Sequence, residues 1–276
     1  MPLPVLLDGE YPDYADVQIS GMQLDSRKVR PGDVFLAMPG ELHDGRQFIE
    51  QAVANGAAAV LAEAPVAGFV EAIPVPLVEL PELRFEAGSL AARFYRNPSR
   101  DMRVVGVTGT NGKTTTSQII AQLARALGKP CGVIGTLGAS LGDQVVNAAN
   151  TTPDPLSLQR QLAQWRQQGV VSVSMEVSSH ALVQGRVNGV QFETAVYTNL
   201  SHDHLDYHGS MEAYGRAKLR LFATEGLCHA VVNADDGFAA VVGTVAAAGG
   251  EGARVVTYST SGAAADVRID NVRFHG

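Results

Sequence analysis

The sequence predicts an α/β protein in which a small amino-terminal α/β domain precedes a central domain with a phosphate-binding loop (P-loop). Three observations support this class. Short apolar runs alternate with segments of helical periodicity through most of the 276 residues. The apolar run 104–107 leads into the loop Gly109-Thr110-Asn111-Gly112-Lys113-Thr114-Thr115, and helical spacing follows that loop. Strands that alternate with helices around such a loop indicate a mostly parallel sheet covered on both faces.

The first domain is predicted to span residues 1–99. Its expected elements are strand 34–38, helix 48–57, strand 58–61, strand 75–78 and helix 83–95. The polar, proline-containing segment 96–100 follows them and is the predicted linker.

The second domain is predicted to span residues 100–276. Its expected elements are strand 102–107, a helix ended by Gly128, strand 131–134, helix 156–168, strand 170–177, strand 192–198, helix 211–222 and strand 230–233. The helix after the loop carries Ile119, Ile120, Leu123 and Leu127 on one face. The pattern then weakens over the Ala/Gly-rich segment 239–252, before strand-like residues at 255–258 and an apolar alternation at Val267, Ile269, Val272 and Phe274.

The composition excludes several classes of protein. A net charge of -7 argues against a general nucleic-acid binder or membrane-surface binder, which would need a basic face. We find no secretory leader and no apolar run long enough to span a membrane, and we therefore expect a cytoplasmic protein. Cys131 and Cys228 match no metal or redox spacing, so we expect two buried free thiols.

The glycine loop has the residues needed to bind a nucleotide. Its glycines allow consecutive N–H groups to face one centre, and the helix that follows adds its positive dipole end. Lys113 is placed to reach the outer phosphates and the Thr114 hydroxyl to bind Mg²⁺. The loop departs from the strict pattern because Val107 stands where the first glycine is expected. An ordinary glycine-rich turn is the less favoured alternative.

Glu176 is the first candidate outside the loop. It ends an apolar strand, and ligands gather at the carboxyl ends of strands in nucleotide-binding sheets, where a second acidic residue organises Mg²⁺. The alternative is a surface glutamate at a strand exit. Beside a phosphate loop, we favour the functional interpretation.

The segment 198–209 is the second dense group of polar residues. It holds His202, His204 and His208 with Asp203 and Asp206, too many polar side chains to bury without partners. A metal, a phosphate or solvent would satisfy them. On spacing alone a zinc site is as good an interpretation as a magnesium site, and a solvated loop is better than either.

Two further groups are ambiguous from the residues alone. Lys218 lies in the middle of a predicted helix, where a lysine is usually solvated, and sequence alone does not select it. The segment Asn233-Ala234-Asp235-Asp236 follows a strand and suits either a nucleotide contact or a polar turn.

Taken together, several motifs resemble the Mur ligase family. They are the glycine loop, Met175-Glu176-Val177-Ser178-Ser179-His180 and Thr198-Asn199-Leu200-Ser201-His202-Asp203-His204-Leu205-Asp206. Leu24-Asp25-Ser26-Arg27, Asp44-Gly45-Arg46 and Asn150-Thr151-Thr152-Pro153 make the sequence similar to the members that add the third residue of the peptidoglycan stem peptide. The resemblance also implies a third, carboxy-terminal domain with an Asp-Asn-Pro-Arg motif. That motif does not occur here, so we expect this domain to be absent.

The resemblance implies a UDP-N-acetylmuramoyl dipeptide as one substrate. The positions that match its contact residues are Leu24, Ser26, Glu41, Leu42, His43, Asn150, Thr151, Thr152, Ser178, Gln184 and Arg186. From the residues alone we would select only Arg186, because a guanidinium offers a planar fork of donors to an anion. Loop capping explains the other polar residues equally well, and core packing explains Leu24.

The resemblance also implies ATP and two Mg²⁺ ions. Thr114 and Glu176 match the ligands of one ion, while His204 and a CO₂-derived carbamate on Lys218 match those of the other. Lys113, Glu176, His204 and Lys218 are then the catalytic residues of an ATP-dependent acid–amino-acid ligase that works through an acyl phosphate. The expected second substrate is a diamino acid, meso-diaminopimelate ahead of L-lysine, and the expected state is a monomer. A folylpolyglutamate synthase-like ligase and a truncated, non-catalytic binding module are the alternatives.

Overall fold

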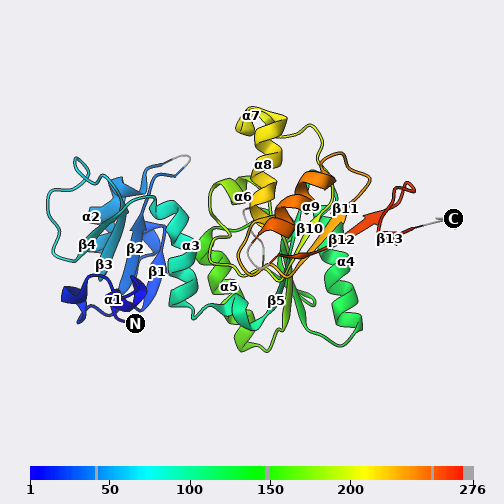
Figure 1. Cartoon of the computed structure of the whole chain (residues 1–276). Coiled ribbons are helices and arrows are strands. Elements are labelled where there is room, and N and C mark those ends of the chain that lie inside the picture. The colour runs from blue at the N-terminus through cyan, green and yellow to red at the C-terminus, as the bar shows by residue number, and fades with distance from the viewer. Residues whose placement is uncertain (41–42, 147–149, 250–251, 270–276) are drawn as a thin grey trace. The chain divides into compact units, whose positions relative to one another are not determined.

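The computed structural model describes residues 1–40, 43–146, 150–249 and 252–269, and it divides the chain into two compact units (Figure 1). The first unit comprises Met1–Asn97, Asp154–Gln161 and Gln184–Val190. The second comprises Pro98–Pro153, Leu162–Val183 and Gln191–Gly276. The division thus falls at 97/98, inside the predicted linker 96–100, and two later segments of the chain group with the first unit.

The first unit contains a four-stranded parallel sheet in the order β1-β2-β3-β4. Its strands are β1 Gly21–Gln23, β2 Asp33–Ala37, β3 Ala59–Glu63 and β4 Leu77–Leu80. Its helices are α1 Leu3–Leu6, α2 Ile49–Ala54 and α3 Leu83–Phe94, with short 3₁₀ turns η1 Pro12–Tyr14, η2 Ser26–Lys28 and η3 Gly45–Phe48. The predicted strands and helices of this domain are therefore confirmed, with ends displaced by a few residues.

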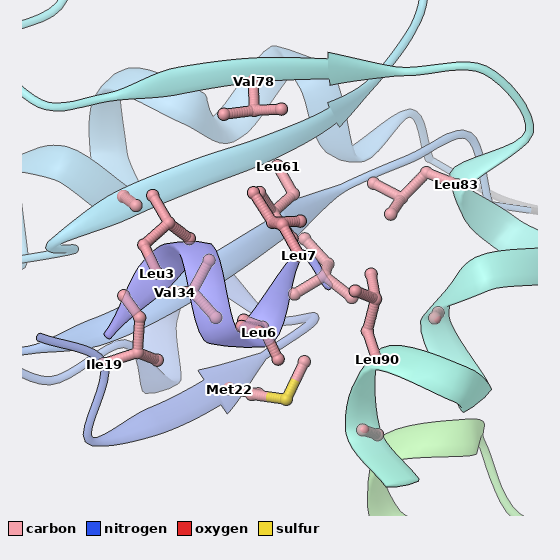
Figure 2. Packing of buried hydrophobic residues seen from close by; sticks show 14 of the residues in the cluster. Leu3, Leu6, Leu7, Ile19, Met22, Val34, Leu61, Val78, Leu83 and Leu90 are labelled. Carbon is pink, nitrogen blue, oxygen red and sulfur yellow. The ribbon is translucent and has the colours of Figure 1, made fainter. Parts of the chain in front are cut away.

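Both faces of this sheet are buried, which explains why β2 and β3 are continuous apolar runs. Successive side chains of a strand point to opposite faces. Val34 and Leu61 accordingly belong to a cluster with α1 and α3, while Phe35 and Val60 belong to a second cluster with α2. Figure 2 shows the first cluster, where Leu61 lies beside Leu7 of the chain's first turn.

The second unit contains a nine-stranded sheet in the order β13-β12-β11-β10-β5-β9-β6-β7-β8. The pairs from β13 to β6 are parallel, and β7 and β8 add an antiparallel hairpin at one edge. The strands are β5 Arg103–Thr108, β6 Cys131–Gly135, β7 Gly138–Leu141, β8 Gln144–Val146, β9 Ser172–Glu176, β10 Thr194–Tyr197, β11 His229–Asn233, β12 Arg254–Ser259 and β13 Val267–Arg268.

Helices cover both faces of the larger sheet (Figure 1). The connection from β5 to β6 contains α4, and the connection from β10 to β11 contains α8; these two run in opposite directions along the sheet, so right-handed crossovers place the two helices on opposite faces. The helices are α4 Lys113–Ala126, α5 Pro155–Gln167, α6 Ser179–Val183, α7 Leu205–His208, α8 Met211–Phe222 and α9 Ala239–Ala248, and the 3₁₀ turn η4 Pro98–Asp101 precedes β5. Within the described ranges, no helix has the length and apolar character that a membrane crossing requires.

Three features differ from the sequence-based expectations. The Ala/Gly-rich segment forms helix α9, because alanine favours a helix even where no apolar stripe marks one. The β7–β8 hairpin was not predicted. Cys131 is buried as expected, but Cys228 is exposed, so the expectation of two buried thiols is wrong. Val272 and Phe274 lie outside the described residues.

The apolar stripe of α4 is not the face that the helix buries. Three of its four members, Ile119, Leu123 and Leu127, are 49%, 60% and 76% exposed, and Ile120 is half-buried. The buried positions are Ser117 and Ala121, whose small side chains face the sheet. Helical spacing identified the stripe correctly but did not determine which face meets the sheet.

We predict that Leu61→Ala weakens the first unit selectively. Leu61 is fully buried, and truncating such a side chain costs about 2–5 kcal/mol, since it removes apolar contacts and leaves a cavity. Hydrogen exchange followed by mass spectrometry should show lower protection in peptides covering β2 and β3. Val5→Ala, at a half-exposed position of α1, is the control and should change protection little. Equal effects of the two substitutions would contradict this description of the core.

Candidate functional site

The carboxyl ends of three adjacent strands define the site. In the register of the sheet, Val107 of β5 pairs with Glu176 of β9, and Thr108 pairs with Tyr197 of β10. The segments that follow these strands therefore leave the sheet at the same edge. The chain passes from β5 to β6 on one side and later to β10 on the other, so β5 lies at a topological switch point, where α/β sheets bind ligands.

The glycine loop has the backbone conformation of a tight phosphate cradle. Gly109 and Gly112 have φ of 146° and 84°, and Gly112 is the residue from which α4 begins. A Cβ on Gly109 would lie 1.9 Å from Thr198 Oγ1, so both conformation and space require glycine there. Lys113 Nζ donates to the carbonyl oxygens of Gly109 and Thr110 at 3.0 and 2.8 Å, which holds the ammonium over the loop. Burial lowers the pKa of Lys113.

The exit of β10 holds the loop in this conformation. The backbone N–H of Thr110 donates to the Asn199 carbonyl at 2.8 Å, and that of Asn111 donates to Asn199 Oδ1 at 3.0 Å. Thr198 Oγ1 donates to the Asn111 carbonyl at 2.7 Å. The segment that fixes the loop, Thr198 and Asn199, therefore lies about 90 residues away in sequence.

Glu176 lies beside the loop and is only 1% exposed, so it is not the surface glutamate of the alternative interpretation. Its Oε2 accepts a hydrogen bond from Thr114 Oγ1 at 2.9 Å. Its Oε1 accepts one from the backbone N–H of Thr136 at 2.8 Å. Two hard oxygen ligands of the kind that Mg²⁺ prefers, the Thr114 hydroxyl and the Glu176 carboxylate, thus stand together next to the phosphate loop.

Lys218 is also 1% exposed, so it is not the solvated lysine that is usual in the middle of a helix. Its Nζ lies 4.1 Å from the ring centroid of Tyr214, one turn earlier in α8. Among the described residues no carboxylate forms an ion pair with it. Burial, assisted by the nearby charge of Lys113, lowers the pKa of Lys218 to about 7. The amine is therefore partly neutral near pH 7.

Histidine and tyrosine rings from three segments of the chain lie on the side of the site that holds Lys218. His204 has φ of 52°, and its Nε2 lies 3.4 Å from Asp203 Oδ2. The His180 ring lies 4.9 Å from that of His204 and 5.4 Å from that of His208, centroid to centroid. Burial, together with the charge of His180, lowers the pKa of His208. His202 is exposed.

These histidines do not form a conventional zinc site. In the part of the chain that the structure describes, no three His, Cys, Asp or Glu side chains group as metal ligands. The structure thus does not bear out the zinc alternative for this part of the chain. A metal on this side would need a further ligand that an unmodified side chain of these types does not supply.

Tyr214 connects the lysine to the phosphate loop. Its hydroxyl lies 3.2 Å from Thr110 Oγ1, and its ring lies 6.1 Å from the ring of His204. Lys218 and His204 therefore flank the loop on its β10 side, while Thr114 and Glu176 flank it on its β9 side.

Thr152 and Ser178, which are matched to substrate contacts in the second unit, lie close to Glu176. Thr152 is fully buried; its hydroxyl donates to the Glu176 carbonyl at 2.9 Å and accepts from the Ser178 N–H at 3.1 Å. Thr151 Oγ1 lies 3.1 Å from Thr136 Oγ1, and Asn150 is exposed. Thr136, which sequence analysis did not select, therefore touches both Glu176 and Thr151.

The other matched residues belong to the first unit. Ser26 Oγ donates to Gln51 Oε1 at 2.6 Å. Leu24 packs against the hydrophobic core, which agrees with the core-packing alternative given for it above. The ring of His43 lies 6.5 Å from that of Phe48. Gln184 and Arg186 are half-buried in the segment 184–190, while Glu41 and Leu42 lie outside the described residues.

The segment Asn233–Asp236 forms a polar turn. Asp236 accepts from the Tyr197 hydroxyl at 2.6 Å and from the Leu200 N–H at 2.9 Å, and Asn233 Nδ2 donates to the Thr198 carbonyl at 2.8 Å. The turn thereby supports the start of the histidine-rich loop.

Two family models match the chain. One, described as Mur ligase family, catalytic domain, covers residues 18–95, and the other, Mur ligase middle domain, covers residues 107–276. The chain belongs to the Mur ligase family. As in the sequence-based prediction, its fold comprises the amino-terminal and middle Mur ligase domains with mostly parallel sheets.

Individual Mur ligases resemble the whole chain. The UDP-N-acetylmuramoyl-L-alanyl-D-glutamate–2,6-diaminopimelate ligase of Ectopseudomonas mendocina (strain ymp) is 48% identical over 278 residues, which cover 100% of this chain and 56% of the relative. The ligase of the same name from Pseudomonas aeruginosa is 46% identical over 273 residues, 99% of this chain and 55% of the relative. A solved structure of a ligase with this name superposes with a TM-score of 0.88 at 36% identity, covering 98% of this chain and 55% of that chain. The chain thus spans about half the length of the curated relatives it matches.

We predict that Gly109→Ala destabilises the second unit more than the same substitution at Gly142 does. The new Cβ would overlap Thr198 Oγ1, adding about 1–3 kcal/mol to a conformational cost of about 1–3 kcal/mol. Gly142→Ala is the control, because Gly142 has φ of 60° but nothing within 4 Å of a Cβ. Urea unfolding followed by Trp165 fluorescence measures both. Equal midpoints for the two variants would show that the overlap does not matter.

Proposed function

We propose that this protein ligates 2,6-diaminopimelate, in its meso form, to UDP-N-acetylmuramoyl-L-alanyl-D-glutamate at the expense of ATP, a step of peptidoglycan synthesis. The observation that carries the proposal is the bond between Thr114 of the phosphate loop and the buried carboxylate of Glu176. It joins a nucleotide cradle to an acidic group at one sheet edge. The names of relatives 46–48% identical over nearly the whole chain support the choice of substrates.

In this proposal the loop Gly109–Thr115 binds the phosphates of ATP. Lys113 already lies over the loop, so a modest movement of its flexible side chain carries the ammonium to the outer phosphates. There it offsets the negative charge that spreads over the transferring oxygens.

The residues present fit one Mg²⁺ ion as they are, and they fit a second ion once a lysine side chain is modified. Thr114 and Glu176 would hold the first. His204 and Lys218 would hold the second once the Lys218 amine carries a carboxylate. When bound, the ions supply positive charge that brings the γ-phosphate and the substrate carboxylate together.

The environment of Lys218 favours that modification. A neutral amine attacks CO₂, forming an N–C bond and releasing one proton to give a carbamate. Its pKa near 7 leaves a substantial neutral fraction, and burial protects the product from water. Without the carbamate, Lys113 and Lys218 would be two cations near one loop.

The reaction then proceeds in two steps. The side-chain carboxylate of the D-glutamyl residue attacks the γ-phosphate, giving an acyl phosphate and ADP. The amine of the diamino acid attacks the acyl carbon, forming the amide and releasing phosphate. Asn150, Thr151, Thr152 and Ser178 in the second unit, and Leu24, Ser26, Glu41, Leu42, His43, Gln184 and Arg186 in the first, are the proposed contacts of the UDP-linked substrate.

L-Lysine is the second candidate for the added amino acid, and the names of the relatives favour diaminopimelate. The folylpolyglutamate synthase-like alternative predicts no affinity for the UDP-sugar. A binding module without turnover would bind both substrates and release no phosphate. We propose that the protein acts in the cytoplasm as a monomer, as the family resemblance implies.

Lys113→Ala should weaken binding of a non-hydrolysable ATP analogue with Mg²⁺ by about 10–100-fold. The reason is the loss of charge-assisted hydrogen bonds to phosphate, each about 1.5–3 kcal/mol. Titration calorimetry measures the affinity. Affinity for the UDP-linked dipeptide should stay within about twofold, and Lys129→Ala, at an exposed lysine just beyond α4, should bind like the unaltered protein. Unchanged nucleotide affinity in Lys113→Ala would refute the assignment.

Lys218→Met should abolish a carbamate that the unaltered protein forms with ¹³C-labelled bicarbonate. Methionine preserves the volume and removes the buried lysine amine beside Tyr214. Carbon-13 NMR detects the carbamate directly, and the signal should strengthen as pH rises through about 7, because the neutral amine then predominates. Lys129→Met should retain the signal. A spectrum without a carbamate in the unaltered protein would remove the second metal site from the proposal.

A further inference from the structure

Thr136, the residue after β6, makes two hydrogen bonds to the Glu176 carboxylate. Its backbone N–H donates to Oε1 at 2.8 Å and its hydroxyl donates to Oε2 at 3.2 Å. Oε2 also accepts from Thr114 Oγ1 at 2.9 Å. Of these three donors, Thr136 supplies two, and Thr136 itself is exposed while the carboxylate is buried.

The contact between Thr136 and Glu176 is close enough to restrict which residue can stand at position 135. A Cβ on Gly135 would lie 2.1 Å from Glu176 Oε1. The carboxylate therefore lies directly against the end of β6, and this is what brings the Thr136 N–H within hydrogen-bond distance. Any larger residue at position 135 would separate the two.

The Thr136 hydroxyl also reaches the segment matched to substrate contacts. Its oxygen lies 3.1 Å from Thr151 Oγ1. A threonine hydroxyl has one proton, and that of Thr136 is donated to Glu176, so Thr151 must donate to Thr136. The result is a continuous chain of hydrogen bonds from Thr151 through Thr136 to Glu176, which meets the bond from Thr114 at the same oxygen.

We propose that Thr136 is a positioning residue that fixes Glu176 for the Mg²⁺–nucleotide and links that carboxylate to the substrate segment at Thr151. The inference rests on the nucleotide and metal roles given under the proposed function. While its proton points at Glu176, Thr114 keeps its oxygen lone pairs available to a cation. The orientation of the carboxylate therefore controls that hydroxyl, and Thr136 controls the carboxylate.

The chain offers a matched set of variants. Thr136→Val keeps the backbone N–H and the branched shape but removes the hydroxyl. Thr136→Ser restores a hydroxyl. Thr244→Val makes the same chemical change at an exposed position of α9, where the hydroxyl donates to the Ala240 carbonyl. Circular dichroism checks that each variant is folded.

The primary measurement is calorimetric binding of a non-hydrolysable ATP analogue to the full chain, in EDTA and across a Mg²⁺ titration. Loss of one hydrogen bond to a charged group predicts that Thr136→Val needs about tenfold more Mg²⁺ for half-saturation. In EDTA, its affinity for the ATP analogue should remain within about twofold of that of the unaltered protein. A general structural defect would instead lower the affinity in EDTA as well. Thr136→Ser should recover most of the Mg²⁺ response, and Thr244→Val should match the unaltered protein.

A double-mutant cycle with Thr151→Val tests the link to the substrate segment. If the hydrogen bonds act as a chain, the free energy of Mg²⁺-dependent nucleotide binding that the double variant loses is smaller than the sum of the losses in the two single variants. Additive losses, or a Thr136→Val variant with an unaltered Mg²⁺ response, would overturn the inference and leave the proposed function intact. If nucleotide binding by the unaltered protein did not depend on Mg²⁺, both the inference and the proposed function would be overturned.

Discussion

The buried carboxylate of Glu176 is the constraint on which the rest of the site depends. An ionised carboxylate removed from water is costly unless donors satisfy it. Thr114 and Thr136 provide those donors from segments that are far apart in sequence, and Gly135 leaves the space for them. The phosphate loop, the end of β6 and the end of β9 are therefore held at one point by the requirements of a single charge.

The other side of the loop presents the opposite electrostatic problem. Lys218 is buried, and among the described residues no carboxylate pairs with it. Lys113 lies near enough to lower the pKa of Lys218 further. Asp203 offsets part of this positive charge, and Glu176 is already hydrogen-bonded to two hydroxyls, so two amines close together still favour an added anion. Nucleotide phosphate meets this need at Lys113, and conversion of the Lys218 amine to a carbamate removes one of the two cations.

Most of the fold was predictable because its elements have strong periodicity. Fully buried strands read as continuous apolar runs, and α8 was predicted with its observed ends, 211–222. The failures have physical causes. Helix α9 is apolar on every side and shows no stripe, the β7–β8 hairpin is short, and most of the apolar stripe of α4 is exposed. Which segments of the chain join the first unit depends on long-range packing, which a local pattern does not contain.

The candidate site was predictable only where its chemistry is local. The loop and the acid at a strand end are visible in short windows, so Lys113 and Glu176 were identified from the residues themselves. Lys218 was not, although a signal existed: it stands at a position of α8 that shares a face with Tyr214, Ala217 and Leu221, where a buried apolar residue is expected. A charged residue at a core position of an amphipathic helix is costly unless it has a function, and that inconsistency marks a site. Thr136 had no such signal, because its role exists only through a carboxylate 40 residues away.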